Sequence, residues 1–148
     1  MIHPNKEIMQ RAIDLAKESH KKGSMAIAAV IVKGDEIISE AVTSVLKDNN
    51  PTNHAEMNAI RKAAEKIKFY SLKDCWLYST FEPRPMCASA AVWASMAGIV
   101  YGSNMDDRNE RYTQRILVKC EDILKKGEPS LKLYKDFMRD ECKELLVL

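Results

Sequence analysis

The first 45 residues pass from a helical to an extended hydrophobic pattern. Apolar residues at helical spacing predict a helix from Asn5, a favourable N-cap residue, to about Lys22. The continuous apolar run 25–32 has the length of a strand, and we expect it to be buried on both faces. Gly34 and Asp35 form a turn before residues 36–45, which are expected to pair with that strand in antiparallel fashion.

The rest of the chain alternates between predicted helices and short predicted strands. The helices are expected over 54–68, 85–96, 118–126 and 136–146. The strands are expected over 75–81, 98–102 and 131–134. Polar stretches at 47–53 and 103–114 are interpreted as surface loops. This order predicts one α/β domain over residues 1–148, with helices on both sides of a mixed five-stranded sheet in a three-layer α/β/α arrangement.

Composition narrows the class of protein without identifying it. The chain has 148 residues, 23 of them Lys or Arg and 21 Asp or Glu, which leaves a formal net charge of +2. Nucleic-acid binding usually goes with a strongly basic face, so a nucleic-acid partner is not expected. No apolar run resembles a signal peptide or a membrane span. Four cysteines without a C-x-x-C pair favour free thiols in the cytoplasm, and a disulfide scaffold is the less favoured alternative.

Two short segments carry residues suited to metal chemistry. The first is His54-Ala55-Glu56, at the start of a predicted helix, where the positive helix end disfavours a protonated histidine. The second includes Cys87 in the first turn of the helix that Pro85 begins, where the helix end favours thiolate. Each has an ordinary alternative, a favoured acidic helix start for Glu56 and core filling for Cys87. Together they describe two helix starts converging on one metal site.

These segments resemble the cytidine/deoxycytidylate deaminase superfamily, whose signature is H-x-E followed by P-C-x-x-C. The stretches 51–61 and 83–93 are similar to the branch containing bacterial guanine deaminases and tRNA adenosine deaminases. The resemblance implies a cytidine-deaminase-like fold in which His54 and Cys87 bind zinc. Glu56 would carry protons for water activated by the metal. Pro83, Pro85 and Met86 would shape the turn and the pocket wall.

The chain departs from this pattern at a metal ligand. Arg84 stands where the family has a cysteine, and a guanidinium offers no lone pair to a cation. We therefore hypothesise that Arg84 occupies the vacated position and forms an ion pair with Glu56, with the alternative that it turns outward to solvent. Thr43 replaces an asparagine that contacts the base in relatives, although a β-branched residue is also ordinary in a strand. Ala28 replaces a common glycine and would narrow the pocket floor slightly.

Two functional hypotheses follow from the resemblance. In the first, the protein is a zinc-dependent hydrolytic deaminase of a free nucleobase or nucleoside, a purine such as guanine or a cytosine-type base, with activity weakened or lost at the missing ligand. In the second, it is a metal-free binding or partner subunit that kept the fold and the pocket. The resemblance also implies a homodimer. We expect Trp76, Trp93, Phe69 and Tyr78 to lie in the core or at an interface.

Overall fold

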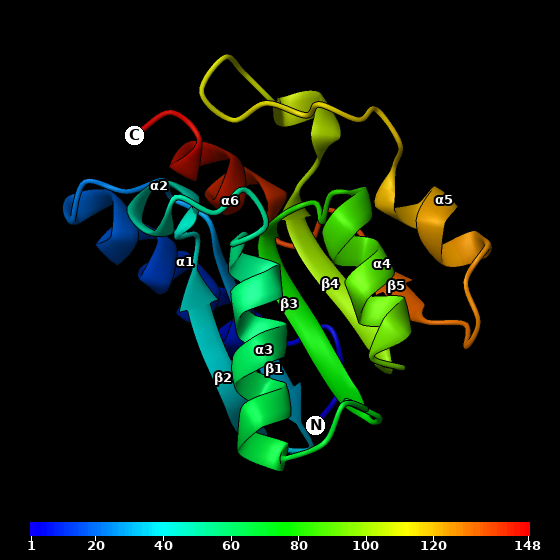
Figure 1. Ribbon diagram of the computed structural model, residues 1–148. Coiled ribbons are helices and arrows are strands. Elements are labelled where there is room, and N and C mark those ends of the chain that lie inside the picture. The colour runs from blue at the N-terminus through cyan, green and yellow to red at the C-terminus, as the bar shows by residue number, and fades with distance from the viewer.

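The computed structural model describes all residues, 1–148. The helices are Lys6–Lys21 (α1), Val45–Asp48 (α2), Ala55–Ile67 (α3), Pro85–Trp93 (α4), Cys120–Lys125 (α5) and Arg139–Leu145 (α6). The strands are Ala28–Lys33 (β1), Glu36–Val42 (β2), Cys75–Phe81 (β3), Gly98–Ser103 (β4) and Lys132–Tyr134 (β5), and Met105–Asp107 is a short 3-10 helix (η1). Figure 1 shows α3 and α4 in front of the sheet, with α1 and α6 behind it. The predicted three-layer fold is confirmed.

The sheet has the strand order β2-β1-β3-β4-β5. β1 pairs in antiparallel fashion with β2 and β3, whereas β3, β4 and β5 are parallel. The mixed five-stranded sheet is therefore as predicted. The parallel pairs require crossover connections, and α4 supplies the one between β3 and β4. β3 is the middle strand of the sheet. The helix that follows it, α4, therefore begins near the middle of the row formed by the strand ends.

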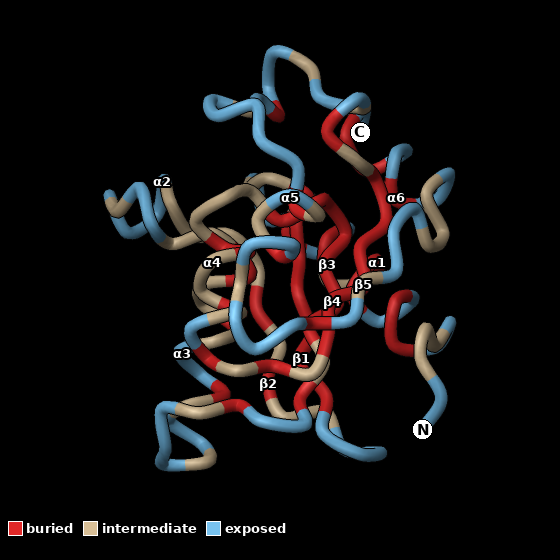
Figure 2. The backbone as a smooth tube through the Cα atoms, turned by 90° about the vertical axis from the view of Figure 1, so that its right-hand side faces the viewer, coloured by how far each residue is buried: buried red, intermediate tan, exposed pale blue.

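The side chains of β1 alternate between two hydrophobic clusters, one on each face of the sheet. Ile27, Ala29 and Ile31 pack with the cluster under α3 and α4, whereas Ala28 and Val30 pack with the cluster under α1. This is the period of two expected for a strand. All of β1 except Lys33 is buried, so the prediction of burial on both faces is confirmed. Figure 2 shows the buried residues concentrated along the strands in the centre of the domain.

Several boundaries differ from the sequence prediction. The stretch predicted as a polar loop before α3 includes the second half of α2, a single helical turn with no side-chain capping bond. The predicted loop 103–114 includes η1, where Asn104 and Asp107 form a reciprocal capping box. Asn5 caps α1 as predicted, accepting a hydrogen bond from the Ile8 amide at 3.1 Å. The two missed turns are too short to show a hydrophobic period.

The amino terminus is fixed to the back of the sheet by aromatic contacts. His3 stacks on Trp76 with ring centroids 4.2 Å apart. Its Nδ1 lies 2.6 Å from the Tyr78 hydroxyl, which also accepts a hydrogen bond from the Asn5 amide. Burial raises the pKa of Tyr78 to about 12, so the hydroxyl keeps its proton. These contacts are structural and lie away from the site described below.

One buried carboxylate fixes the segment that connects β4 to α5. Glu82, directly after β3, is 4% exposed. Its Oε1 accepts a hydrogen bond from the Met105 amide at 3.0 Å, and its Oε2 accepts one from the Cys120 amide at 2.8 Å. Met105 and Cys120 stand at the two ends of a long loop, which we call the 106–119 loop. Glu82 therefore joins both ends of this loop to the end of the central strand.

Replacing this carboxylate tests its structural role. Glu82→Ala leaves two buried amides without a partner, and each is expected to cost about 1–3 kcal/mol in the free energy of unfolding. Urea denaturation followed by circular dichroism measures the loss. Glu36→Ala is the matched control, because Glu36 pairs with Lys66 at 3.3 Å on the exposed surface. Such a surface pair contributes about 0–1 kcal/mol. Equal losses in the two variants would contradict the role given to Glu82.

Candidate functional site

The starts of α3 and α4 meet at one edge of the sheet. His54 is the N-cap of α3 and Arg84 the N-cap of α4, and both have extended backbone angles. Pro85 follows as the first residue of α4, as predicted, and Cys87 lies in the same first turn. The Sγ atom of Cys87 lies 3.7 Å from Nδ1 of His54. The structure thus brings together the two residues that the resemblance names as metal ligands.

Glu56 lies next to this pair, on the first turn of α3. Its side chain is fully buried, and neither carboxyl oxygen has a hydrogen-bond partner. Burial raises the pKa of this carboxyl, and the positive charge of Arg84 opposes the rise only in part. In the protein without a bound metal, Glu56 is therefore an unusually weak acid with free hydrogen-bonding capacity.

Burial also controls the protonation of the His54–Cys87 pair. It lowers the pKa of His54 to about 4, and the charge of Arg84 adds to the effect, so the ring is neutral at physiological pH. Burial raises the pKa of the Cys87 thiol, with a further contribution from Glu56. The expectation that the helix start favours thiolate is therefore wrong for the protein alone, because desolvation outweighs the helix dipole at this depth.

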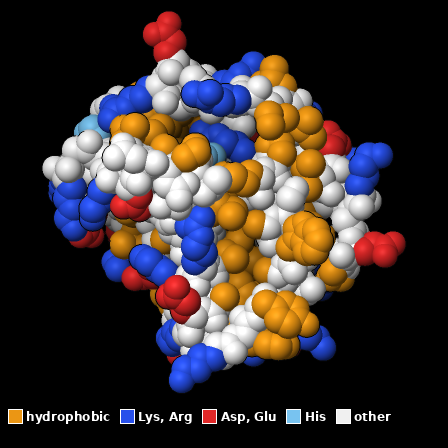
Figure 3. Space-filling model, in the orientation of Figure 1, with side chains coloured by type: hydrophobic (Ala, Val, Ile, Leu, Met, Phe, Trp, Pro, Cys, Tyr) orange, Lys and Arg blue, Asp and Glu red, His pale blue; other side chains and the backbone are white.

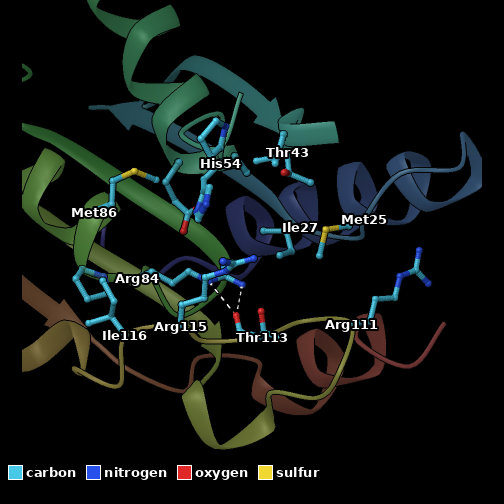
Figure 4. Close-up of a pocket in the computed structure, with 15 residues that line it drawn as sticks. Met25, Ile27, Thr43, His54, Arg84, Met86, Arg111, Thr113, Arg115 and Ile116 are labelled. Carbon is cyan, nitrogen blue, oxygen red and sulfur yellow. Dashed lines mark hydrogen bonds between the residues drawn. The ribbon is translucent and has the colours of Figure 1, made fainter. Parts of the chain in front are cut away.

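Arg84 takes neither of the two directions considered from the sequence. Its Nε and Nη2 donate hydrogen bonds to the Thr113 carbonyl at 3.3 and 3.0 Å, and its guanidinium lies 5.0 Å from the centre of the Phe81 ring. It makes no ion pair with Glu56, so that part of the hypothesis is wrong. Figure 4 shows these hydrogen bonds from Arg84 to Thr113, a residue of the 106–119 loop. The carbonyl and the ring together hold the guanidinium away from the buried carboxyl.

A cavity of about 380 Å³ opens in front of these residues. Its lining includes His54, Glu56, Arg84 and the predicted pocket residues Thr43, Pro85 and Met86. Ala28 does not line it, because its side chain lies on the α1 face of the sheet. Pro83 and Cys87 are both buried, and neither lines the cavity. Three of the five residues predicted for the substrate pocket therefore line this cavity.

The residues present supply two of the three protein ligands that a catalytic zinc requires. The 3.7 Å between Nδ1 and Sγ is close to the separation of about 3.5 Å that zinc bonds of about 2.0 and 2.3 Å give at a tetrahedral angle. No group of three His, Cys, Asp or Glu side chains is arranged to hold a metal ion. At the position where the resemblance implies a third ligand the chain has Arg84, which has no lone pair. The donor set does not fit a three-ligand zinc centre.

The far wall of the cavity comes from residues that sequence reasoning missed. Arg111, Thr113, Arg115 and Ile116 of the 106–119 loop all line it. The loop is anchored by Tyr112, which is 1% exposed and whose hydroxyl accepts a hydrogen bond from the buried Ala26 amide at 2.9 Å. A tyrosine flanked by polar residues was the available signal, because a lone aromatic in a polar stretch often anchors a loop.

Comparison with known proteins identifies the family. Residues 3–103 match the family described as the cytidine and deoxycytidylate deaminase zinc-binding region. The chain belongs to this deaminase family. No helix in it has both the length and the apolar character needed to cross a bilayer. The predicted fold and family are both confirmed, and the two segments that carried the resemblance lie inside the matched region.

The relatives of this family member act on two kinds of substrate. Guanine deaminase from Bacillus subtilis is 42% identical over 103 residues, which cover 69% of this chain and 66% of that protein. A tRNA-specific adenosine deaminase from Buchnera aphidicola is 31% identical over 93% of this chain and 88% of that protein. The X-ray structure of the Bacillus subtilis guanine deaminase superposes with a TM-score of 0.71 at 39% identity, covering 77% of this chain and 72% of that one.

The raised pKa of Glu56 predicts a pH-dependent stability. Above about pH 4.5 the unfolded chain releases this proton while the folded chain retains it, so rising pH favours unfolding until the folded pKa is reached. Glu56→Gln removes this proton equilibrium. In chelator-treated protein, the stability of Glu56→Gln relative to the unmodified chain should therefore increase by about 1.4 kcal/mol per pH unit within that window. Urea titrations between pH 4 and 8 measure the slope.

The matched control is Glu65→Gln, at an exposed position on the same helix. Because this side chain is exposed, its substitution controls for the exchange of a carboxyl for an amide on this helix. If the stability difference for Glu56→Gln did not change with pH, other groups would offset the burial of this carboxyl in the folded protein. That outcome would contradict the prediction.

Proposed function

We propose that this deaminase-family protein binds a free nucleobase or nucleoside in the cavity, and that its hydrolytic activity is weakened or lost together with the third metal ligand. The observation that carries the proposal is the position of Arg84. It stands where the resemblance implies a third ligand, it has no lone pair for a metal, and its guanidinium is fixed by two hydrogen bonds to the Thr113 carbonyl. The relative that acts on guanine supports a purine as the ligand.

The cavity offers groups that complement the polar edge of a base. A protonated Glu56 can donate to a ring nitrogen and accept from an amino group, and both of its oxygens are without another partner. His54 is neutral and can also form a hydrogen bond. Met86 and Pro85 supply an apolar wall for the faces of the ring. These groups match a planar, partly polar ligand of the usual kind for such cavities.

The second candidate is the zinc-dependent hydrolysis itself, with the metal held by His54, Cys87 and water. The 3.7 Å spacing of the two donor atoms favours it, because that spacing already suits one tetrahedral ion. In such proteins the metal supplies a hydroxide at neutral pH. The two candidates differ in whether the unmodified protein retains zinc, and this can be measured directly.

Metal content and ammonia release separate the two candidates. We expect the purified chain to hold far less than one zinc by mass spectrometry and to release no ammonia from guanine, guanosine, adenosine or cytidine. Arg84→Cys completes the donor set and should hold about one zinc per chain. Adding His54→Ala to that variant should remove the metal again, which controls for binding elsewhere. About one zinc and steady ammonia release in the unmodified chain would establish the second candidate instead.

We also propose that the protein is a homodimer, as the resemblance implies. Trp93, the last residue of α4, is 86% exposed, and Phe69, after α3, is 55% exposed. Figure 3 shows apolar side chains gathered over α3 and α4. Of the four aromatics expected in the core or at an interface, only Tyr78 is fully buried. An exposed apolar face of this kind favours association with another surface.

A charge on this face should disrupt the dimer. A tryptophan at the centre of an interface contributes at least about 2 kcal/mol, so Trp93→Glu is expected to raise the dimer dissociation constant about 30-fold. Light scattering after size exclusion over a concentration series measures the shift. Ile2→Glu, at an 85% exposed position near the amino terminus, is the control and should leave the dimer unchanged. A monomer at all concentrations for the unmodified chain would contradict the proposal.

A further inference from the structure

Three arginines line the same cavity. Arg84 comes from the start of α4, and Arg111 and Arg115 come from the 106–119 loop. Figure 4 shows them on the side of the cavity opposite Thr43. The only carboxyl in the lining is Glu56, so the lining is positive even if that group is ionised. Since the whole chain has a formal charge of +2, this concentration of positive charge is local.

None of the three guanidinium groups has a carboxylate partner. Ion pairs elsewhere join Arg11 to Glu40 and Arg139 to Asp107. By contrast, Arg84 donates only to the Thr113 carbonyl, which uses two of its five N–H groups. Arg111 lies 5.7 Å from the centre of the Tyr112 ring, and Arg115 makes no hydrogen bond or ion pair. Most of the donor groups around the cavity are therefore free to bind an anion.

The cavity combines this positive side with an apolar one. Met25, Ile27, Val45 and Met86 supply apolar surface, and the volume of about 380 Å³ lies within the usual range of small-molecule sites, about 300–1,000 Å³. A free base would use the apolar wall and Glu56 and leave the arginines without a partner. A phosphate is the anion that guanidinium groups bind best, because two parallel N–H groups match two of its oxygens.

We propose that Arg84, Arg111 and Arg115 bind the phosphate of a nucleoside monophosphate whose base lies in the cavity. This inference rests on the proposed function and specifies its ligand class as a nucleotide. It also gives the arginine at the metal-ligand position a role, since Arg84 binds the anionic part of the ligand instead of a cation. The Thr113 carbonyl and the Phe81 ring hold its guanidinium in one orientation.

Calorimetric titration with guanine, guanosine and guanosine 5′-monophosphate, and with the adenosine series, tests the inference. The monophosphate should bind at least about tenfold more tightly than the nucleoside, and its affinity should fall as salt is raised. Arg111→Gln and Arg115→Gln should each reduce that preference about tenfold and leave the affinity for the nucleoside unchanged. Arg11→Gln, outside the cavity, is the charge-matched control and should change neither affinity.

The outcomes separate this inference from the function on which it rests. Equal affinities for nucleoside and monophosphate, unaffected by the arginine substitutions, would overturn the inference and leave base binding intact. No binding of base, nucleoside or nucleotide would overturn the proposed function itself. Inorganic phosphate binding as tightly as the monophosphate would exclude a contribution of the base. If bulk tRNA bound through the same arginines while all mononucleotides bound weakly, the inference would be overturned, and the ligand would be an RNA backbone instead of a mononucleotide.

Discussion

The two hydrogen bonds accepted by Glu82 determine the shape of the site. One carboxylate receives the amide that precedes the 106–119 loop and the amide that follows it, so both ends of the loop are fixed at the end of β3. Arg84 begins α4 only two residues later. The segment that carries Arg84 and Cys87 and the loop that forms the far wall of the cavity are therefore attached to the same point of the sheet. Without that attachment, Thr113 would not be held where the Arg84 guanidinium can reach it.

Much of the fold could be predicted because it depends on local patterns. The strand β3 was predicted with its observed bounds, since an apolar run between polar flanks defines it. The meeting of His54 and Cys87 was predicted because two helices that begin at one sheet edge bring their first turns together. The other elements agree with the structure because the family resemblance implied the order of helices and strands as well as the motifs.

The errors concern interactions that no local pattern encodes. The direction of Arg84 depends on a backbone carbonyl 29 residues away in the sequence. The importance of Glu82 depends on two amides that approach it only after folding. Ala28 was placed at the pocket floor, although the alternation of β1 turns its side chain to the opposite face. In each case the residue type was known and the partner was not, because the partner is set by tertiary packing.

The way the 106–119 loop is closed has a consequence for how the family can vary. Both ends are held by one buried carboxylate, and Tyr112 anchors the middle of the loop in the core, so the sheet and its helices depend on these points more than on the exposed residues between them. The entropic cost of a flexible loop rises only with the logarithm of its length, about 0.6 kcal/mol for each doubling. Exposed residues between these anchors can therefore be gained, lost or exchanged at little cost to the scaffold. Substitutions in this segment can change which ligand the cavity prefers while the fold stays constant. It is therefore the segment to vary when a different ligand specificity is to be engineered.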